Sequence, residues 1–148
     1  MIRMNAMALL LAVAPACVVY DVDPHPHGGG GSTVVVTNAP PYVVSADAWV
    51  YYDPAYGDDI WAFEAMVDDP NGVYDVIGVW ADVYDEYAGG VLVESFELYP
   101  TNDPYVWYSD WLGSTTYLDP FWPGYTVDFV VYDAYDDFGW TTVWADTY

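Results

Sequence analysis

The sequence has almost no positive charge. Arg3 is the only Lys or Arg among 148 residues, against 23 Asp and Glu, and the formal net charge at pH 7 is −22. Nucleic acids and anionic membrane surfaces repel such a chain, so neither is expected as a partner. Basic surfaces, divalent cations and neutral ligands such as sugars remain compatible with this charge.

Cysteine and histidine are also scarce. The single cysteine, Cys17, excludes a disulfide framework within one chain. The only histidines, His25 and His27, precede the segment predicted to fold. That segment therefore lacks the residues for Ser-His, Cys-His or lysine Schiff-base chemistry, and it has no glycine-rich phosphate loop with a lysine. We expect a protein that is not an enzyme.

The first sixteen residues have the pattern of a secretory signal peptide. Arg3 precedes an apolar run from Ala6 to Ala14, which is too short to span a bilayer, and small residues follow up to Ala16. Cys17 comes next, and this arrangement resembles a bacterial lipoprotein signal, in which the cysteine is lipidated and becomes the first residue. We predict a lipid anchor at Cys17 and a place in the outer membrane or on the cell surface. The alternative is plain secretion with a free thiol.

Residues 17–32 are predicted to be a tether. The segment contains two prolines and four consecutive glycines and shows no hydrophobic period. His25 and His27 lie in it and are interpreted as solvated linker residues.

Residues 33–148 are predicted to form one all-β domain. Apolar residues make up 55% of the chain, which argues against disorder despite the charge. Short alternating runs, beginning with TVVVT at 33–37, are separated by turn clusters about every ten residues, and no segment has a helical period. This pattern predicts an antiparallel β-sandwich of seven or eight strands.

Alternation along the strands predicts which side chains face the core. The expected core positions are Trp61, Phe63, Ala65 and Val67 near 60–67, Ile77, Val79, Ala81 and Val83 near 76–84, and Tyr125, Val127, Phe129 and Val131 near 125–132. The opposite sides carry the carboxylates. An unpaired buried carboxylate costs several kcal/mol, and the domain has no Lys or Arg to pair with it.

Two segments, AMVDDPNGVYDVIGVWADVYD and PGYTVDFVVYDAYDDFGWTTVWAD, resemble strand units of bacterial immunoglobulin-like domains of the PKD and cadherin-like kind. The matching positions include Gly124, Tyr125, Val127, Phe129, Val131 and Asp133. The resemblance implies an immunoglobulin-like sandwich, a fold that serves as spacer, adhesin or binding module. The chain lacks the D-x-N-D-N and D-R-E motifs of cadherin calcium sites, so cadherin-type calcium binding is not implied.

Acidic loops are the first candidate site. In such a sandwich the loops DDPNG and DAYDDFG emerge at the same end, which brings together Asp68, Asp69, Asn71, Asp133, Asp136 and Asp137. Neighbouring carboxylates repel each other unless they spread into solvent or share a cation, and Ca²⁺ suits oxygen ligands of this kind. The alternative is that these residues serve turn geometry alone. The fold requires no cofactor, and Ca²⁺ is the one ion that the loops suggest.

Aromatic residues are the second candidate site. Trp80, Tyr84, Tyr132, Trp140 and Trp144 fall on the outward side of the predicted strands, with Asp82 and Asp128 beside them. Such a strip suits a protein partner or self-association, and it equally suits sugar rings, unless another segment covers it. We expect a non-catalytic envelope lipoprotein that acts in display, spacing or protein contact. The alternative is a carbohydrate-binding module.

Overall fold

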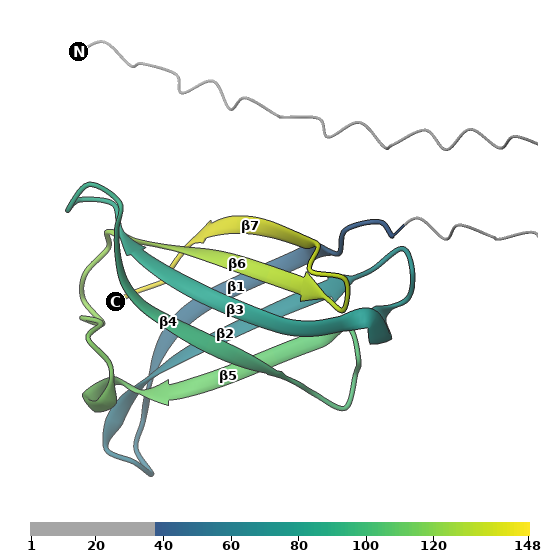
Figure 1. Ribbon diagram of the computed structural model, residues 1–148. Helices are drawn as coiled ribbons and strands as arrows, with labels where there is room; N and C mark the ends of the chain where they lie inside the picture. Colours follow the sequence, from purple (N-terminus) through teal and green to yellow (C-terminus); the bar gives the residue numbers. More distant parts are fainter. Residues whose placement is uncertain (1–37) are drawn as a thin grey trace, which may run out of the picture. The chain divides into compact units, whose positions relative to one another are not determined.

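Seven strands account for most of residues 38–148, the part of the chain that the computed structural model describes (Figure 1). They are β1 (Tyr42–Asp53), β2 (Asp58–Asp68), β3 (Val76–Asp85), β4 (Val91–Pro100), β5 (Val106–Leu112), β6 (Tyr125–Asp133) and β7 (Phe138–Trp144), with single 3₁₀ turns at Val73–Asp75 and Gly113–Thr115. No helix in this part of the chain is long and apolar enough to cross a membrane. The predicted signal peptide, the tether and the strand at 33–37 lie outside the described residues.

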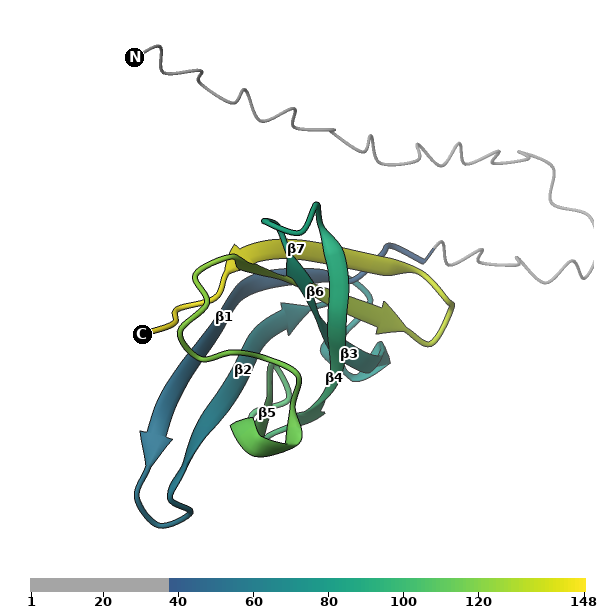
Figure 2. The same ribbon diagram turned by 90° about the vertical axis from the view of Figure 1, so that its left-hand side faces the viewer.

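The strands pair in the order β1-β2-β5-β4-β3-β6-β7, and all neighbours in this order are antiparallel. Strands β1, β2 and β5 form one layer, and β3, β4, β6 and β7 form the other. Figure 2 shows β1 and β2 along one side of the domain, β3 and β4 along the other, and β7 across the top. Strand β4 joins the two layers, because its last residues, Tyr99 and Pro100, pair with β5. The predicted antiparallel sandwich is confirmed, and the strand order is consistent with an immunoglobulin-like arrangement.

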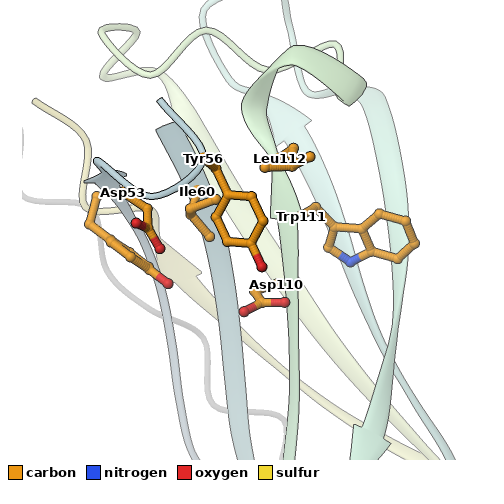
Figure 3. A pocket seen from close by; sticks show the side chains of 7 residues that line it. Asp53, Tyr56, Ile60, Asp110, Trp111 and Leu112 are labelled. Atoms are coloured by element: carbon orange, nitrogen blue, oxygen red, sulfur yellow. The ribbon is translucent and has the colours of Figure 1, made fainter. Parts of the chain in front are cut away.

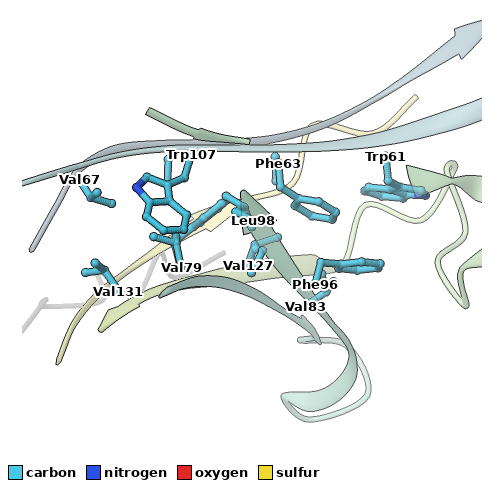
Figure 4. Close-up of a cluster of buried hydrophobic side chains, with 14 of the residues drawn as sticks. Trp61, Phe63, Val67, Val79, Val83, Phe96, Leu98, Trp107, Val127 and Val131 are labelled. Atoms are coloured by element: carbon cyan, nitrogen blue, oxygen red, sulfur yellow. The ribbon is translucent and has the colours of Figure 1, made fainter. Parts of the chain in front are cut away.

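The core lies between the two layers (Figure 4). Trp61, Phe63 and Val67 of β2 point inward from one layer and are fully buried. Val79 of β3 and Val127 of β6 meet them from the other layer. The core side predicted for β2 and β6 is confirmed, because every residue named for it is buried. Ile60, Ala62 and Thr126 on the opposite side are buried as well.

Ile77 is the exception, because it was predicted to be in the core and is 63% exposed. The pairing of β3 with β6 shifts register between Val76 and Gly78. An extra residue at such a bulge turns the side chains that precede it to the opposite face. Val76 is therefore buried in place of Ile77. The prediction for Ile77 was wrong, while Val79, Ala81 and Val83 beyond the bulge are buried as expected.

Candidate functional site

The five aromatic side chains singled out in the sequence lie on the outer face of the layer that contains β3, β6 and β7. Trp80 and Tyr84 belong to β3, Tyr132 to β6, and Trp140 and Trp144 to β7. Trp140 is 61% exposed and Trp144 is 60% exposed. Trp80 and Tyr132 are also exposed, whereas Tyr84 is partly buried. On β3 and β6 the inward neighbours fill the core, which fixes the direction of the outward side chains. On β7 the inward side chains are only partly buried, and Val143 packs against the core.

Strand register gathers these side chains into one surface. Trp80 and Trp140 flank Val130 in one row across the three strands. Tyr84 and Trp144 flank Thr126 in another row. Phe138, which the sequence analysis missed, pairs with Tyr132, and the ring centroids lie 6.0 Å apart. Its position two residues before Trp140 was the available signal. We call the surface of Trp80, Tyr84, Tyr132, Phe138, Trp140 and Trp144 the aromatic face.

Two carboxylates lie at the centre of the aromatic face. Asp82 of β3 is directly opposite Asp128 of β6, and Thr142 of β7 completes the row. The Thr142 hydroxyl donates a hydrogen bond to Asp128. Partial burial, together with the negative charges of Asp82 and Asp128, raises the pKa of Tyr84. The described residues include no Lys, Arg or His, so none of them supplies a positive side chain to this pair.

The acidic loops meet at one end of the domain, where Asn38 and Ala39 connect them. The Asn38 side-chain amide donates to the carboxylates of Asp133 and Asp137, at 2.9 Å from Oδ2 of Asp137. The backbone N–H of Ala39 donates to Oδ1 of Asn71 at 2.8 Å. The segment before β1 thus contacts the loop after β2 and the loop after β6. Sequence patterns did not indicate this role of Asn38.

Within these loops the carboxylates stabilise the turns by accepting hydrogen bonds from backbone N–H groups. Oδ1 of Asp133 accepts hydrogen bonds from the backbone N–H groups of Tyr135 and Asp137, at 2.8 and 2.9 Å. Asp133 is fully buried, and burial raises its pKa, but the Asn38 amide and these two N–H groups outweigh that effect and hold the pKa below its ordinary value. Oδ1 of Asp69 accepts from the N–H of Asn71 at 2.6 Å. These bonds favour the turn-geometry interpretation of both loops.

The other predicted metal ligands do not converge on one point. Oδ2 of Asp68 accepts a hydrogen bond from the Tyr42 hydroxyl, and Asp136 is exposed with a φ of 65°. One oxygen of Asp69, which is 4% exposed, has no hydrogen-bond partner among residues 38–148. The described part of the chain nevertheless holds no group of three or more acidic side chains arranged to bind a metal ion. Calcium binding therefore stays a prediction from the sequence.

A hollow of about 220 Å³ opens on the other layer, and the sequence analysis missed it. Its lining residues are Tyr51, Asp53, Tyr56, Ile60, Asp110, Trp111 and Leu112 (Figure 3). Tyr56 lies over Asp110 in this view, and the Trp111 indole points away from them. The sequence did contain a signal for this hollow. Tyr51 and Asp53 are two residues apart on β1 and share its outward side, and Tyr108 and Asp110 do the same on β5.

Negative charge also shapes this second surface. The Tyr108 hydroxyl is 3.4 Å from Oδ2 of Asp110. Burial, followed by the charge of Asp110 and the neighbouring Tyr51, raises the pKa of Tyr108 to about 12. The hollow combines phenol rings with carboxylates, and the Trp111 indole points away from them. The aromatic face gathers six rings from three adjacent strands, against three rings in the hollow, and is therefore the stronger candidate.

Fold and surfaces together define the class of this protein: an all-antiparallel β-sandwich domain with an acidic, aromatic outer face. Comparisons of the chain with protein-family models, with curated proteins and with solved structures found no match. The predicted lipid-attachment residue, Cys17, lies outside the described residues.

Proposed function

We propose that this chain is an exported, non-catalytic envelope lipoprotein with one immunoglobulin-like domain of the PKD and cadherin-like kind. In this proposal Cys17 carries the lipid, residues 17–32 act as the tether, and the aromatic face contacts a protein partner. The signal-like start and the position of Cys17 directly after it support export and anchoring.

The exposure of the aromatic face is the observation that carries the proposal. Indole and phenol rings from three adjacent strands lie side by side on one surface of residues 38–148. Contiguous apolar surface of several hundred Å² seldom stays bare on a monomer, and Trp and Tyr are the residues that most often anchor protein interfaces. Strands β3 and β6 are held by the core and β7 pairs with β6 along its whole length, so binding requires little ordering of the chain.

Carbohydrate binding is the second candidate for the same surface. Trp140 and Trp144 project from one face of β7 with Thr142 between them, and Asp128 lies beside this row. Flat indole faces can stack on sugar rings while carboxylates and hydroxyls accept or donate hydrogen bonds to the sugar. A glycan array of neutral oligosaccharides tests this candidate. Glycan binding that is lost in Trp140→Ala and Trp144→Ala would support carbohydrate recognition. If no glycan on the array binds, this candidate is wrong.

A photocrosslinking experiment in cells tests the proposed protein contact. A photoreactive residue replaces Thr142 at the centre of the aromatic face and leaves every ring in place. The control replaces Tyr117, which is 84% exposed and lies outside the seven strands. We expect a discrete polypeptide adduct from position 142 that Trp140→Ala abolishes, and none from position 117. No adduct from position 142 would contradict the proposal.

A further inference from the structure

The Asp82–Asp128 pair determines what kind of partner the aromatic face accepts. Side chains at directly opposite positions of antiparallel strands have Cβ atoms only about 4.5–5.5 Å apart, and like charges there destabilise the sheet. Asp82 and Asp128 are such a pair, and both are partly exposed. The Thr142 hydroxyl bonds to Asp128 but brings no charge. The described part of the chain has no Lys, Arg or His to offset the pair.

Aromatic rings surround the pair along the strand direction. Trp80 and Trp140 lie in the row two residues to one side, and Tyr84 and Trp144 lie two residues to the other side. Two residues of a strand span roughly 7 Å, so a group seated over the carboxylates is within reach of rings in both rows. A cation in that position gains an ion pair with the carboxylates and a cation–π contact with the rings. Arginine fits best, because its planar guanidinium both stacks on rings and binds carboxylates through two N–H groups.

Two other occupants are disfavoured by the charge. A second copy of this domain would bring four carboxylates together, and residues 38–148 of that copy have no positive side chain to offer. A neutral glycan could accept stacking but would leave both charges without compensation. Charge complementarity thus selects a positively charged occupant.

We infer that the partner of the aromatic face is a polypeptide segment with exposed arginine or lysine side chains, and that one of these seats over Asp82 and Asp128. This inference rests on the proposed protein contact and specifies its chemistry. In this inference the domain supplies the negative charge of the contact and the partner supplies the positive charge.

A peptide-binding measurement tests the inference. The probe is a fluorescent peptide of alternating arginine and glycine, and its control replaces each arginine with citrulline, which has the same shape without the charge. We expect the full chain to bind the arginine peptide at least about tenfold more tightly than the citrulline peptide, because only the former can pair with the carboxylates. The variant Asp82→Asn/Asp128→Asn should lose about tenfold in affinity for the arginine peptide.

A second acidic pair provides a matched control. Asp47 of β1 is directly opposite Glu64 of β2 on the other layer, and both are exposed. The variant Asp47→Asn/Glu64→Gln removes the same charge, and its affinity should stay within about twofold of the unaltered chain, because it keeps the proposed seat. Equal losses in both variants would show general charge attraction and overturn the inference. The melting temperature of each variant verifies that it is folded.

The two proposals can fail separately. If the adduct at position 142 forms in cells but the Asp82→Asn/Asp128→Asn variant binds the arginine peptide as well as the unaltered chain, the protein contact stands and the charge-based inference is wrong. If no adduct forms at position 142, the proposed contact itself is wrong, whatever the peptide does.

Discussion

The main chain of Asp146 pairs in parallel with that of Trp49, near the middle of the first strand. The N–H of Asp146 donates to the carbonyl of Ala48 at 2.8 Å, and its carbonyl accepts from the N–H of Val50 at 3.0 Å. This parallel bridge connects the segment after β7 to β1 and nearly closes the sheet. Pairing of this kind satisfies backbone groups that an open edge strand would expose.

Asp146→Pro should lower the free energy of unfolding by about 1–3 kcal/mol, because proline removes the N–H and leaves the buried carbonyl of Ala48 without its partner. Asp146→Ala keeps the N–H, so we expect a change within about 0.5 kcal/mol. Chemical denaturation of both variants measures the difference. Equal stabilities for the two variants would show that the bridge contributes little.

Gly139→Ala should also destabilise the domain. A Cβ on Gly139 would come within 2.2 Å of the Pro41 carbonyl oxygen. That oxygen belongs to the main chain and cannot rotate away, so strand β7 or the segment before β1 has to move. Forced overpacking of this kind costs about 1–3 kcal/mol. Gly78→Ala is the matched control, because its nearest contact would be an ordinary 3.7 Å from Nε1 of Trp80. Thermal unfolding compares them, and a tolerated Gly139→Ala would contradict the close approach.

The Asp133 carboxylate should contribute stability that depends on pH. Its folded-state pKa lies below the ordinary value, so the contribution is fully present above the unfolded-state pKa of about 3.9 and is lost as the pH falls through the folded pKa. At pH 7 we expect Asp133→Asn to cost about 1–3 kcal/mol, since the carboxylate is buried and accepts several hydrogen bonds.

Denaturation of Asp133→Asn and of the unaltered chain at pH 7 and at pH 2 checks this prediction. The difference between the two proteins should shrink as the pH falls through the folded-state pKa of Asp133, because protonation then removes the charge that distinguishes it from asparagine. Asp136→Asn is the control in the same hairpin, because Asp136 is exposed and asparagine tolerates its φ of 65°. A gap that does not narrow anywhere as the pH is lowered, or an equal loss in the control, would contradict the assignment.

Salt should raise the melting temperature. Residues 38–148 carry many carboxylates and no Lys, Arg or His, so the folded domain repels itself and NaCl screens that repulsion. CaCl₂ at equal ionic strength tests the calcium site predicted from the sequence, and an effect equal to that of NaCl would show screening alone. A larger rise with calcium, reversed by a chelator, would support the calcium site predicted from the sequence.

Cys17→Ser should release the protein from the membrane fraction, because serine cannot take the thioether-linked lipid. Val18→Ser makes a polar change one residue later and should leave the protein at the membrane. Fractionation of cells that express each variant gives the result. Membrane association that survives Cys17→Ser would rule out the lipid anchor at this residue.

Much of the fold could be predicted from local patterns. In a domain without Lys or Arg, a carboxylate in the middle of a strand favours solvent, so Glu64 and Asp128 mark the outward side of their strands and Phe63 and Phe129 mark the core. Asp133 is buried at a strand end, where Asn38 and backbone N–H groups bind its carboxylate. The pattern failed at Ile77, because a bulge depends on how β3 pairs with β6 and not on β3 alone. The hollow beside Tyr51 and Asp110 was missed for a related reason, since its walls come from strands that are far apart in the chain.

The sequence by itself determined that this chain forms strands with one apolar and one acidic side. Side-chain direction alternates with every residue, and burying an unpaired carboxylate costs several kcal/mol. Only the tertiary structure decided which carboxylates face each other, as Asp82 and Asp128 do, and which distant residues meet, as Asn38 and Asp133 do across 95 positions of the chain. Register between strands depends on packing and turn geometry across the whole domain, and no local pattern contains that information.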